Sequence, residues 1–246
     1  MEIEKIINRW FDETQNNLTK TKDSSDMIDG LCRTISSVFK TYCDATIRLL
    51  EHDPKVLPAM ALLRIMSELI IKSLWCLNVT KNEEIKERIK RWEKAGVKKR
   101  KKFVKELLES EGSFDPATVD KFKQELAKLD EYLKDNIVDE MPKVTGPNGL
   151  FKETKNIFDR NICAQAYRQF NHAVHVDTLV LTWSTQRKAN AIYYTGDLDE
   201  NIESLKLHCL SFSYMVIKVV YVHYGWKSDQ IEEEYQKALS DYTANS

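Results

Sequence analysis

Four polar residues within one short stretch, Arg168, Asn171, His172 and His175, have types and a spacing suited to phosphate chemistry. Positions i, i+3, i+4 and i+7 of an α-helix lie on one face, so a helix here would bring the four side chains together. An arginine holds anionic oxygens with a planar fork of donors, and a histidine exchanges protons near neutral pH. The stretch therefore predicts a helix face, the Arg/His face, that could bind a phosphate and move protons beside it.

The composition of the Arg/His face differs from that of an ordinary solvated surface. Exposed helix stripes usually hold Lys and Glu, whereas this one holds neutral amides, two histidines and a single arginine. Such a set is typical of an active site. Paired polar groups also occur in purely structural networks, so a structural role stays open as the alternative.

A second polar stripe runs along the most apolar segment of the chain, residues 56–79. Arg64, Glu68 and Lys72 recur there at four-residue spacing, which would be costly in lipid. We therefore expect a core helix rather than a membrane span. The stripe could simply face water, with Arg64 and Glu68 paired at i,i+4, or it could lie opposite the Arg/His face.

Composition sets the fold class. The chain has 246 residues, 42% of them hydrophobic, with only seven glycines and five prolines. No run of short alternating strands is visible, so we predict an all-α fold, a multi-helix bundle with one long, charged antiparallel helical hairpin. The formal net charge of -1 gives no global attraction to nucleic acid or to anionic lipid.

The N-terminus and the cysteines indicate the compartment. Residues Met1 to Lys5 are acidic and polar, where a secretory signal would need a basic start and an apolar run. The five cysteines are scattered without a Cys-x-x-Cys pair, so neither a zinc site nor a redox pair is indicated. We expect a cytoplasmic protein with buried free thiols, no membrane segment, no metal and no cofactor.

Two successive segments of opposite charge predict the helical hairpin. Residues 81–105 carry twelve basic and four acidic residues, and residues 106–140 carry eleven acidic and four basic ones. Each has an apolar seam, so the two would pair as antiparallel helices whose charges largely satisfy each other. The basic run within the first segment is the alternative nucleic-acid contact, and it consists of Lys98, Lys99, Arg100, Lys101 and Lys102.

Residues 142–149 hold the densest cluster of helix-breaking residues and divide the chain. We predict N-terminal bundle helices in residues 1–80, the hairpin as an insertion at 81–141, and C-terminal helices in 150–246. The last segment carries the Arg/His face and would complete one compact domain with 1–80. A loop is expected to contain Tyr193 to Asp197.

Arg168, followed by a polar residue and separated from His175 by six residues, resembles the arginine-to-histidine signature of the HEPN superfamily. That superfamily is an all-helical group rich in bacterial toxin and defence ribonucleases. The segments Leu62 to Glu68 and Phe170 to His175, with Arg-x3-Glu and Asn-x3-His spacings, also resemble a family of uncharacterised bacterial helical proteins. The second resemblance implies no activity.

The HEPN resemblance implies metal-independent RNA cleavage, as in a toxin or phage-defence endoribonuclease. His175 would act as general acid or base at the ribose 2′-hydroxyl or the leaving oxygen, and Arg168 would stabilise the transition state. Asn171 and His172 would orient the phosphate. Glu68 would hold a histidine ring or the arginine if the two stripes face each other, and Arg64 would join the basic run in substrate binding. The expected partners are RNA and a second copy of the chain, because such sites are generally built across a homodimer.

Two other functions fit the same residues. In a non-catalytic binding module, Arg64, Glu68, Arg168 and His175 would form a buried network that specifies helix packing, and the charged hairpin would meet a protein partner. In a metal protein, His172, His175 and Glu68 would be ligands. The His-x-x-His spacing permits a metal, but structural zinc usually recruits cysteine.

Overall fold

The computed structural model describes residues 3–21, 26–51, 56–110, 114–144, 149–150, 164, 167, 168, 170, 185–188, 191–194 and 199–245. The described helices confirm the all-α class with its helical hairpin. They are α1 (Ile3–Lys20), α2 (Met27–Glu51), α3 (Val56–Leu77), α4 (Asn82–Glu109), α5 (Pro116–Asp135), α9 (Asp199–Tyr224) and α10 (Asp229–Asn245). The chain divides into a bundle unit, Met1–Asn78 with Val144–Ser246, and a hairpin unit, Val79–Lys143.

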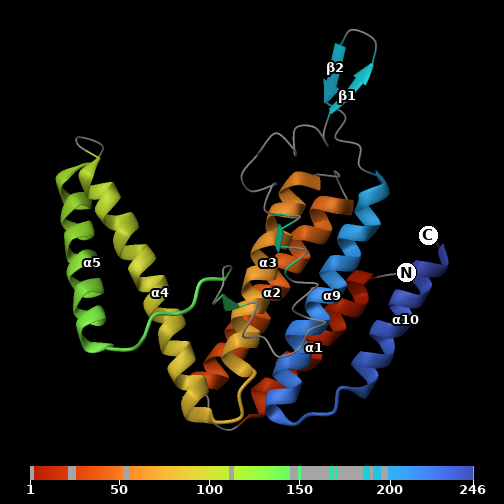
Figure 1. The fold of residues 1–246 in the computed structure, drawn as a ribbon, viewed down its shortest axis with the longest axis horizontal. Helices are drawn as coiled ribbons and strands as arrows, with labels where there is room; N and C mark the ends of the chain where they lie inside the picture. The colour runs from red at the N-terminus through yellow and green to blue at the C-terminus, as the bar shows by residue number, and fades with distance from the viewer. Residues whose placement is uncertain are drawn as a thin grey trace. The chain divides into compact units, whose positions relative to one another are not determined.

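The bundle unit is built on α1, α2, α3 and α9, which pack side by side (Figure 1). Each helix turns an apolar stripe inward because its large apolar residues recur at three- and four-residue spacing. Phe11, Phe39, Leu63 and Phe212, one from each helix, are fully buried. Four described cysteines, Cys32, Cys43, Cys76 and Cys209, are buried in the same core and form no disulfide.

Helix α9 is the one described helix that is long and apolar enough, over Ile202–Tyr224, to cross a membrane by length and composition. Within the bundle, 67% of its most apolar window is buried. Its polar groups are satisfied locally, as where Ser213 Oγ donates to the carbonyl of Cys209 at 2.7 Å. We therefore describe α9 as a core helix of the bundle.

A glycine ends α9 where the sequence breaks the helical pattern. Gly225 has φ +66°, a left-handed conformation that costs a residue without Cβ little. The amide of Trp226 donates to the carbonyl of Tyr221 at 2.9 Å, which satisfies a carbonyl left open at the helix end. The turn sends the chain into α10, which buries Ile231 and Tyr235.

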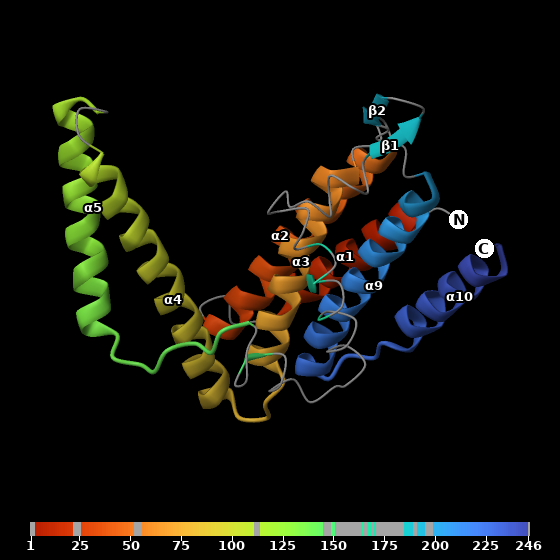
Figure 2. The ribbon, with the colours of Figure 1, turned by 45° about the horizontal axis from the view of Figure 1, so that its top comes forward.

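The hairpin unit pairs α4 with α5 (Figures 1 and 2). Helix α5 begins as its sequence predicts, with Asp115 at the N-cap and Pro116 at the first turn. The Asp115 carboxylate accepts from the amide of Thr118 at 3.1 Å and from its hydroxyl at 2.7 Å. These hydrogen bonds lower the pKa of Asp115, and the hydroxyl bond contributes most.

The expectation of a loop is wrong for Tyr193 and Tyr194, while its other residues, 195–197, lie outside the described part of the chain. Strands β1 (Thr185–Lys188) and β2 (Ala191–Tyr194) form an antiparallel ribbon in which Thr185 pairs with Tyr194 and Lys188 with Ala191. Ile192 and the two tyrosines favour strand structure, but four residues are too few to show a period in the sequence.

The contact between α1 and α10 gives a test of the bundle core. Trp10 is fully buried and its Nε1 donates to Glu234 at 2.7 Å. We expect Trp10→Phe to lower the free energy of unfolding by about 2 kcal/mol, because a hydrogen bond to a charged acceptor is lost. Urea denaturation followed by circular dichroism measures the change.

Arg9 is the matched control because it contacts the same carboxylate from an exposed position, at 2.5 Å with 53% of its side chain accessible. Arg9→Ala should cost less than about 1 kcal/mol, since exposed ion pairs contribute little. Equal losses for the two variants would show that the buried hydrogen bond does not anchor α10.

Candidate functional site

Helix α3 carries a carboxylate held between two cations. Glu68 accepts from Arg64 Nη1 at 2.8 Å through one oxygen and from Lys72 Nζ at 2.5 Å through the other. The four-residue spacing places all three on one helix face, as the sequence predicts for Arg64 and Glu68. Their side chains are largely covered, with 12%, 24% and 16% exposed for Arg64, Glu68 and Lys72.

The two cations determine the protonation of Glu68. Burial by itself would raise the pKa of this carboxyl, but the hydrogen bonds from Lys72 and Arg64 lower it to about 2. Glu68 is therefore a carboxylate at any physiological pH. It suits a positioning role better than proton transfer, because a general acid or base works best with a pKa near the working pH.

The described helical residues 164, 167, 168 and 170 reach this cluster through an aromatic ring. Arg64 Cζ lies 3.5 Å from the ring centroid of Tyr167, which is a close cation–π contact. One turn further on, the buried Phe170 packs edge to face against His208 of α9, with centroids 5.2 Å apart. Burial lowers the pKa of His208, so the neutral ring is favoured in the core. Tyr167 and Phe170 thus anchor this segment on α3 and α9.

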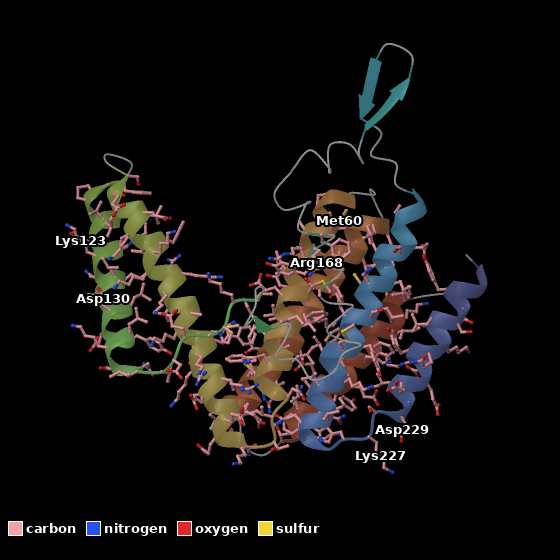
Figure 3. The ribbon with its side chains drawn as sticks, viewed as in Figure 1. Met60, Lys123, Asp130, Arg168, Lys227 and Asp229 are labelled. Atoms are coloured by element: carbon pink, nitrogen blue, oxygen red, sulfur yellow. The ribbon has the colours of Figure 1, made fainter. Side chains whose placement is uncertain are left out.

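Arg168 lies between these two anchors and is exposed (Figure 3). It is helical, as predicted, and has no ion-pair or hydrogen-bond partner among the described residues. The residue that meets Arg64 is therefore Tyr167 and not Arg168. Asn171, His172 and His175, the other members of the predicted Arg/His face, lie outside the described residues.

The basic run of α4 is largely engaged with acidic side chains of its own unit. Arg100 makes a bidentate pair with Glu125, with Nε at 2.6 Å and Nη2 at 3.1 Å from its oxygens. Lys98 pairs with Glu140, Lys101 with Asp130, and Lys102 with Glu106 at 3.7 Å (Asp130 is labelled in Figure 3). These partners lower the pKa values of Glu125, Asp130 and Glu140. Within the described chain, Lys99 alone of the five has no acidic partner.

A groove elsewhere in the bundle unit holds none of the predicted site residues. It is open, has a volume of about 530 Å³ and lies between α1 and Gln230 of α10. Arg9 and Asn8 on its wall are already bonded to Glu234 and Lys40. No cluster of three potential metal ligands occurs among the described residues.

The sequence pattern indicated the polar residues of this region but not the ring that connects its two elements. Tyr167 follows no polar spacing, and its partner Arg64 is distant in the chain. The one available signal was an aromatic residue directly before Arg168, and that signal is too common to assign a contact.

Fold and site together define a class, an all-helical bundle protein with an inserted charged hairpin and an ion-pair cluster of Arg64, Glu68 and Lys72 on its third helix. The chain belongs to DUF5677, a family of unknown function, whose model matches residues 34–190. The matched range includes Arg64, Glu68 and the whole predicted Arg/His face. Comparison with curated proteins and with solved structures found no match.

The low pKa of Glu68 predicts how stability depends on pH. Because the folded pKa of about 2 lies below the ordinary value of 4.5, the stabilisation is complete above about pH 4.5 and is lost as the pH falls toward 2. Glu68→Gln should therefore destabilise the protein at pH 7 by on the order of 2 kcal/mol and by progressively less below pH 4.5. Denaturant titrations at pH 7, 4.5 and 3 measure this difference.

Glu203 of α9 provides the control, because it is 61% exposed and pairs with Lys206 at 3.1 Å in the same unit. Glu203→Gln should change stability little at any of the three pH values. A Glu68→Gln deficit that stays constant from pH 7 to pH 3 would contradict the assigned pKa.

Proposed function

We propose that this protein is a metal-independent RNA phosphodiesterase of the HEPN type, with Arg168 and His175 as its reacting residues. The observation that carries the proposal is the position of Arg168. It is exposed on a helical segment that Tyr167 and Phe170 hold against the core, and no described acid neutralises it. A guanidinium that is in contact with solvent and has no acidic partner among the described residues is suited to bind a phosphate.

The chemistry follows from the residue types. A histidine takes the proton of a ribose 2′-hydroxyl, the 2′-oxygen bonds to phosphorus, and the bond to the 5′-oxygen breaks as that oxygen gains a proton. His175 performs one of these proton transfers, and Arg168 stabilises the charge on the phosphoryl oxygens. Asn171 and His172 orient the phosphate or assist the second transfer. The products are a 2′,3′-cyclic phosphate and a free 5′-hydroxyl.

The α3 cluster acts as a support in this proposal. Glu68 is fully ionised and holds Arg64, and Arg64 holds the ring of Tyr167. The cluster therefore positions the helical segment that carries Arg168 and takes no part in proton transfer. Arg64 is 12% exposed, so direct contact between Arg64 and substrate is less favoured than contact through Arg168.

On the hairpin unit, the basic residues proposed to contact the substrate are those least engaged in ion pairs within the protein. Lys99 has no acidic partner in the described chain, and Lys102 is 80% exposed with a long 3.7 Å pair. Lys98, Arg100 and Lys101 are already neutralised across the hairpin. In the proposal, Lys99 and Lys102 supply the attraction to the RNA backbone.

The proposal also includes a homodimeric assembly and a cytosolic location. Two copies of the chain form the site, because each contributes one Arg/His face. The protein works in the cytosol, where cleavage of cellular RNA would arrest growth, as expected of a toxin or a phage-defence effector.

A non-catalytic binding module is the second candidate, and the ion-pair cluster on α3 favours it. The Arg64, Glu68 and Lys72 cluster with the Tyr167 ring is a network of the kind that specifies helix packing. In that case the protein would cleave no RNA. Substitutions in the cluster would change stability alone, and the hairpin unit would bind a protein.

The activity test uses purified protein and a labelled single-stranded RNA, with EDTA present. The parent should cleave the RNA to a cyclic phosphate product. Arg168→Ala and His175→Ala should each lower the rate about 10²- to 10⁴-fold, because transition-state stabilisation or proton transfer is lost. Arg168→Ala should leave the free energy of unfolding within about 0.5 kcal/mol, since an exposed side chain without described partners is removed.

Lys227→Ala, an exposed cation in the turn before α10, is the matched control and should cleave at the parental rate. RNA that stays intact with the parent protein, or a cleavage rate that Arg168→Ala does not change, would refute the proposal. Loss of activity on EDTA treatment would refute the metal-independent mechanism.

A further inference from the structure

The hairpin unit leaves an apolar stripe uncovered along one of its flanks. Its described helices are α4 and α5, and a pair of helices covers only the side that each turns to the other. Helix α4 buries Ile85, Ile89 and Val104, and α5 buries no residue. The uncovered set, which we call the hairpin stripe, consists of Trp92, Phe103 and Leu107 of α4 and Phe122, Leu129 and Tyr132 of α5, none of them buried.

Ion pairs across the hairpin show which flank the stripe occupies. Arg100 Nε donates to Glu125 at 2.6 Å on one side of the contact between α4 and α5. Lys101 pairs with Asp130 on the other side, because successive residues of a helix point about 100° apart. The Arg100 guanidinium lies 5.5 Å from the centroid of the Phe103 ring, so Phe103 lies on the Arg100 side. Its side chain is among the exposed large apolar ones, at 48%.

Helical spacing places the rest of the stripe on the same flank. Positions three, four, seven or eleven apart on a helix share a face. The stripe residues of α4 have this spacing from Phe103, and those of α5 have it from Glu125 or from one another. The opposite flank of α5 is charged and carries Lys123 and Asp130, both labelled in Figure 3.

Lysines border the hairpin stripe along both of its outer edges. On α4, Lys99 lies one helical turn before Phe103. On α5, Lys128 lies one turn before Tyr132 and two turns after Lys121. All three lysines are exposed, and none is paired with an acid among the described residues. The stripe is therefore an apolar surface between two basic edges.

The stripe and its edges restrict what can cover it. A helix laid along α4 and α5 would bury the apolar residues and meet lysines on both sides. A second copy of the chain would present the same patch and set lysines against lysines. RNA would match the lysines, but Leu107 and Leu129 offer bases no ring for stacking. Glu106, the acid two turns after Lys99, is already paired with Lys102, so the edge of α4 stays basic.

We infer that the hairpin stripe is a docking surface for an acidic amphipathic helix of a partner protein. The apolar face of that helix packs on the stripe, and acidic residues along both sides of this face pair with the bordering lysines. The inference goes beyond the proposed RNA cleavage and does not depend on it. A partner bound at this surface would also cover Lys99, so it would compete with RNA for that lysine.

The binding experiment uses the full chain and a fluorescein-labelled helical peptide of about 21 residues, with anisotropy as the readout. The peptide carries leucines at alternating three- and four-residue spacing, glutamates beside them and alanines elsewhere, and the parent should bind it saturably. Phe103→Ser should weaken binding about 10-fold or more, because a central aromatic anchor is lost. Phe103→Leu should keep most of the affinity. Val222→Ser removes a 69% exposed apolar residue of α9 and should bind as the parent does.

A pair of charge variants tests the basic edges. Lys121→Glu with Lys128→Glu reverses charge beside the stripe, and Lys123→Glu with Lys134→Glu makes the same change on the opposite flank of α5. The first should weaken binding about 10-fold and the second much less, because charges a helix diameter away are largely screened at physiological salt. The same peptide with lysines in place of glutamates should not bind. Circular dichroism should show parental helicity and melting for every variant.

Three outcomes would overturn the inference. The first is absence of binding by the acidic peptide, or equal affinity for the parent and Phe103→Ser. The second is a parent dimer in sedimentation velocity that Phe103→Ser converts to a monomer, which would assign the surface to a second copy. The third is an oligouridylate that binds the parent and is weakened by Phe103→Ser while the peptide does not bind, which would assign the surface to RNA.

Cleavage measurements keep this inference separate from the proposed function. Arg168→Ala should abolish RNA cleavage and bind the acidic peptide with parental affinity. A parent protein that binds the peptide and cleaves no RNA would refute the activity and support the docking surface. A parent that cleaves RNA and does not bind the peptide would support the activity and refute the docking surface.

Discussion

The contact between the Arg64 guanidinium and the Tyr167 ring is the constraint on which the site depends. It joins α3 to a segment about a hundred residues later in the chain, and Glu68 binds the same guanidinium through a hydrogen bond of 2.8 Å. Removing the carboxylate would take away the acceptor that Arg64 and Lys72 share in a largely covered position. The cluster of Arg64, Glu68 and Lys72 therefore contributes to the packing of the bundle and differs from an ordinary solvent-exposed ion pair.

Helical geometry determines the direction of Arg168 once Tyr167 is held by Arg64. Successive residues of a helix are about 100° apart, so Tyr167 and Phe170 lie within about 60° of each other and Arg168 points away from both. Because Tyr167 faces α3 and Phe170 faces α9, Arg168 must face outward. Its exposure is thus a consequence of the two buried rings, and this helical segment cannot rotate to cover it without losing both contacts.

The helices could be predicted from the sequence because local patterns determine them. Apolar spacing, the Asp115 cap and Gly225 after α9 each act within a few residues, so such signals can be read directly from the sequence. The i,i+4 pair of Arg64 and Glu68 could be predicted for the same reason. The ring of Tyr167 over Arg64 and the pairing of β1 with β2 could not, because the first depends on tertiary packing and the second on strands too short to show a period.

Some arginines of the described chain are bound to a carboxylate and others are not. This difference matters more for phosphate binding than the net charge of the chain does. Arg64 and Arg100 have similar side chains to Arg168, but each is bound to a carboxylate, Glu68 or Glu125. A phosphate that approached either of them would have to compete with that carboxylate, which costs most of the gain. Arg168 needs no such exchange among the described residues. Glu68 is an ionised carboxylate near neutral pH, so it cannot supply a proton, and the proposed function assigns proton transfer to a histidine instead. The arrangement therefore separates residues held in ion pairs on α3 from Arg168, which presents its charge to solvent and which the proposed function uses in the reaction.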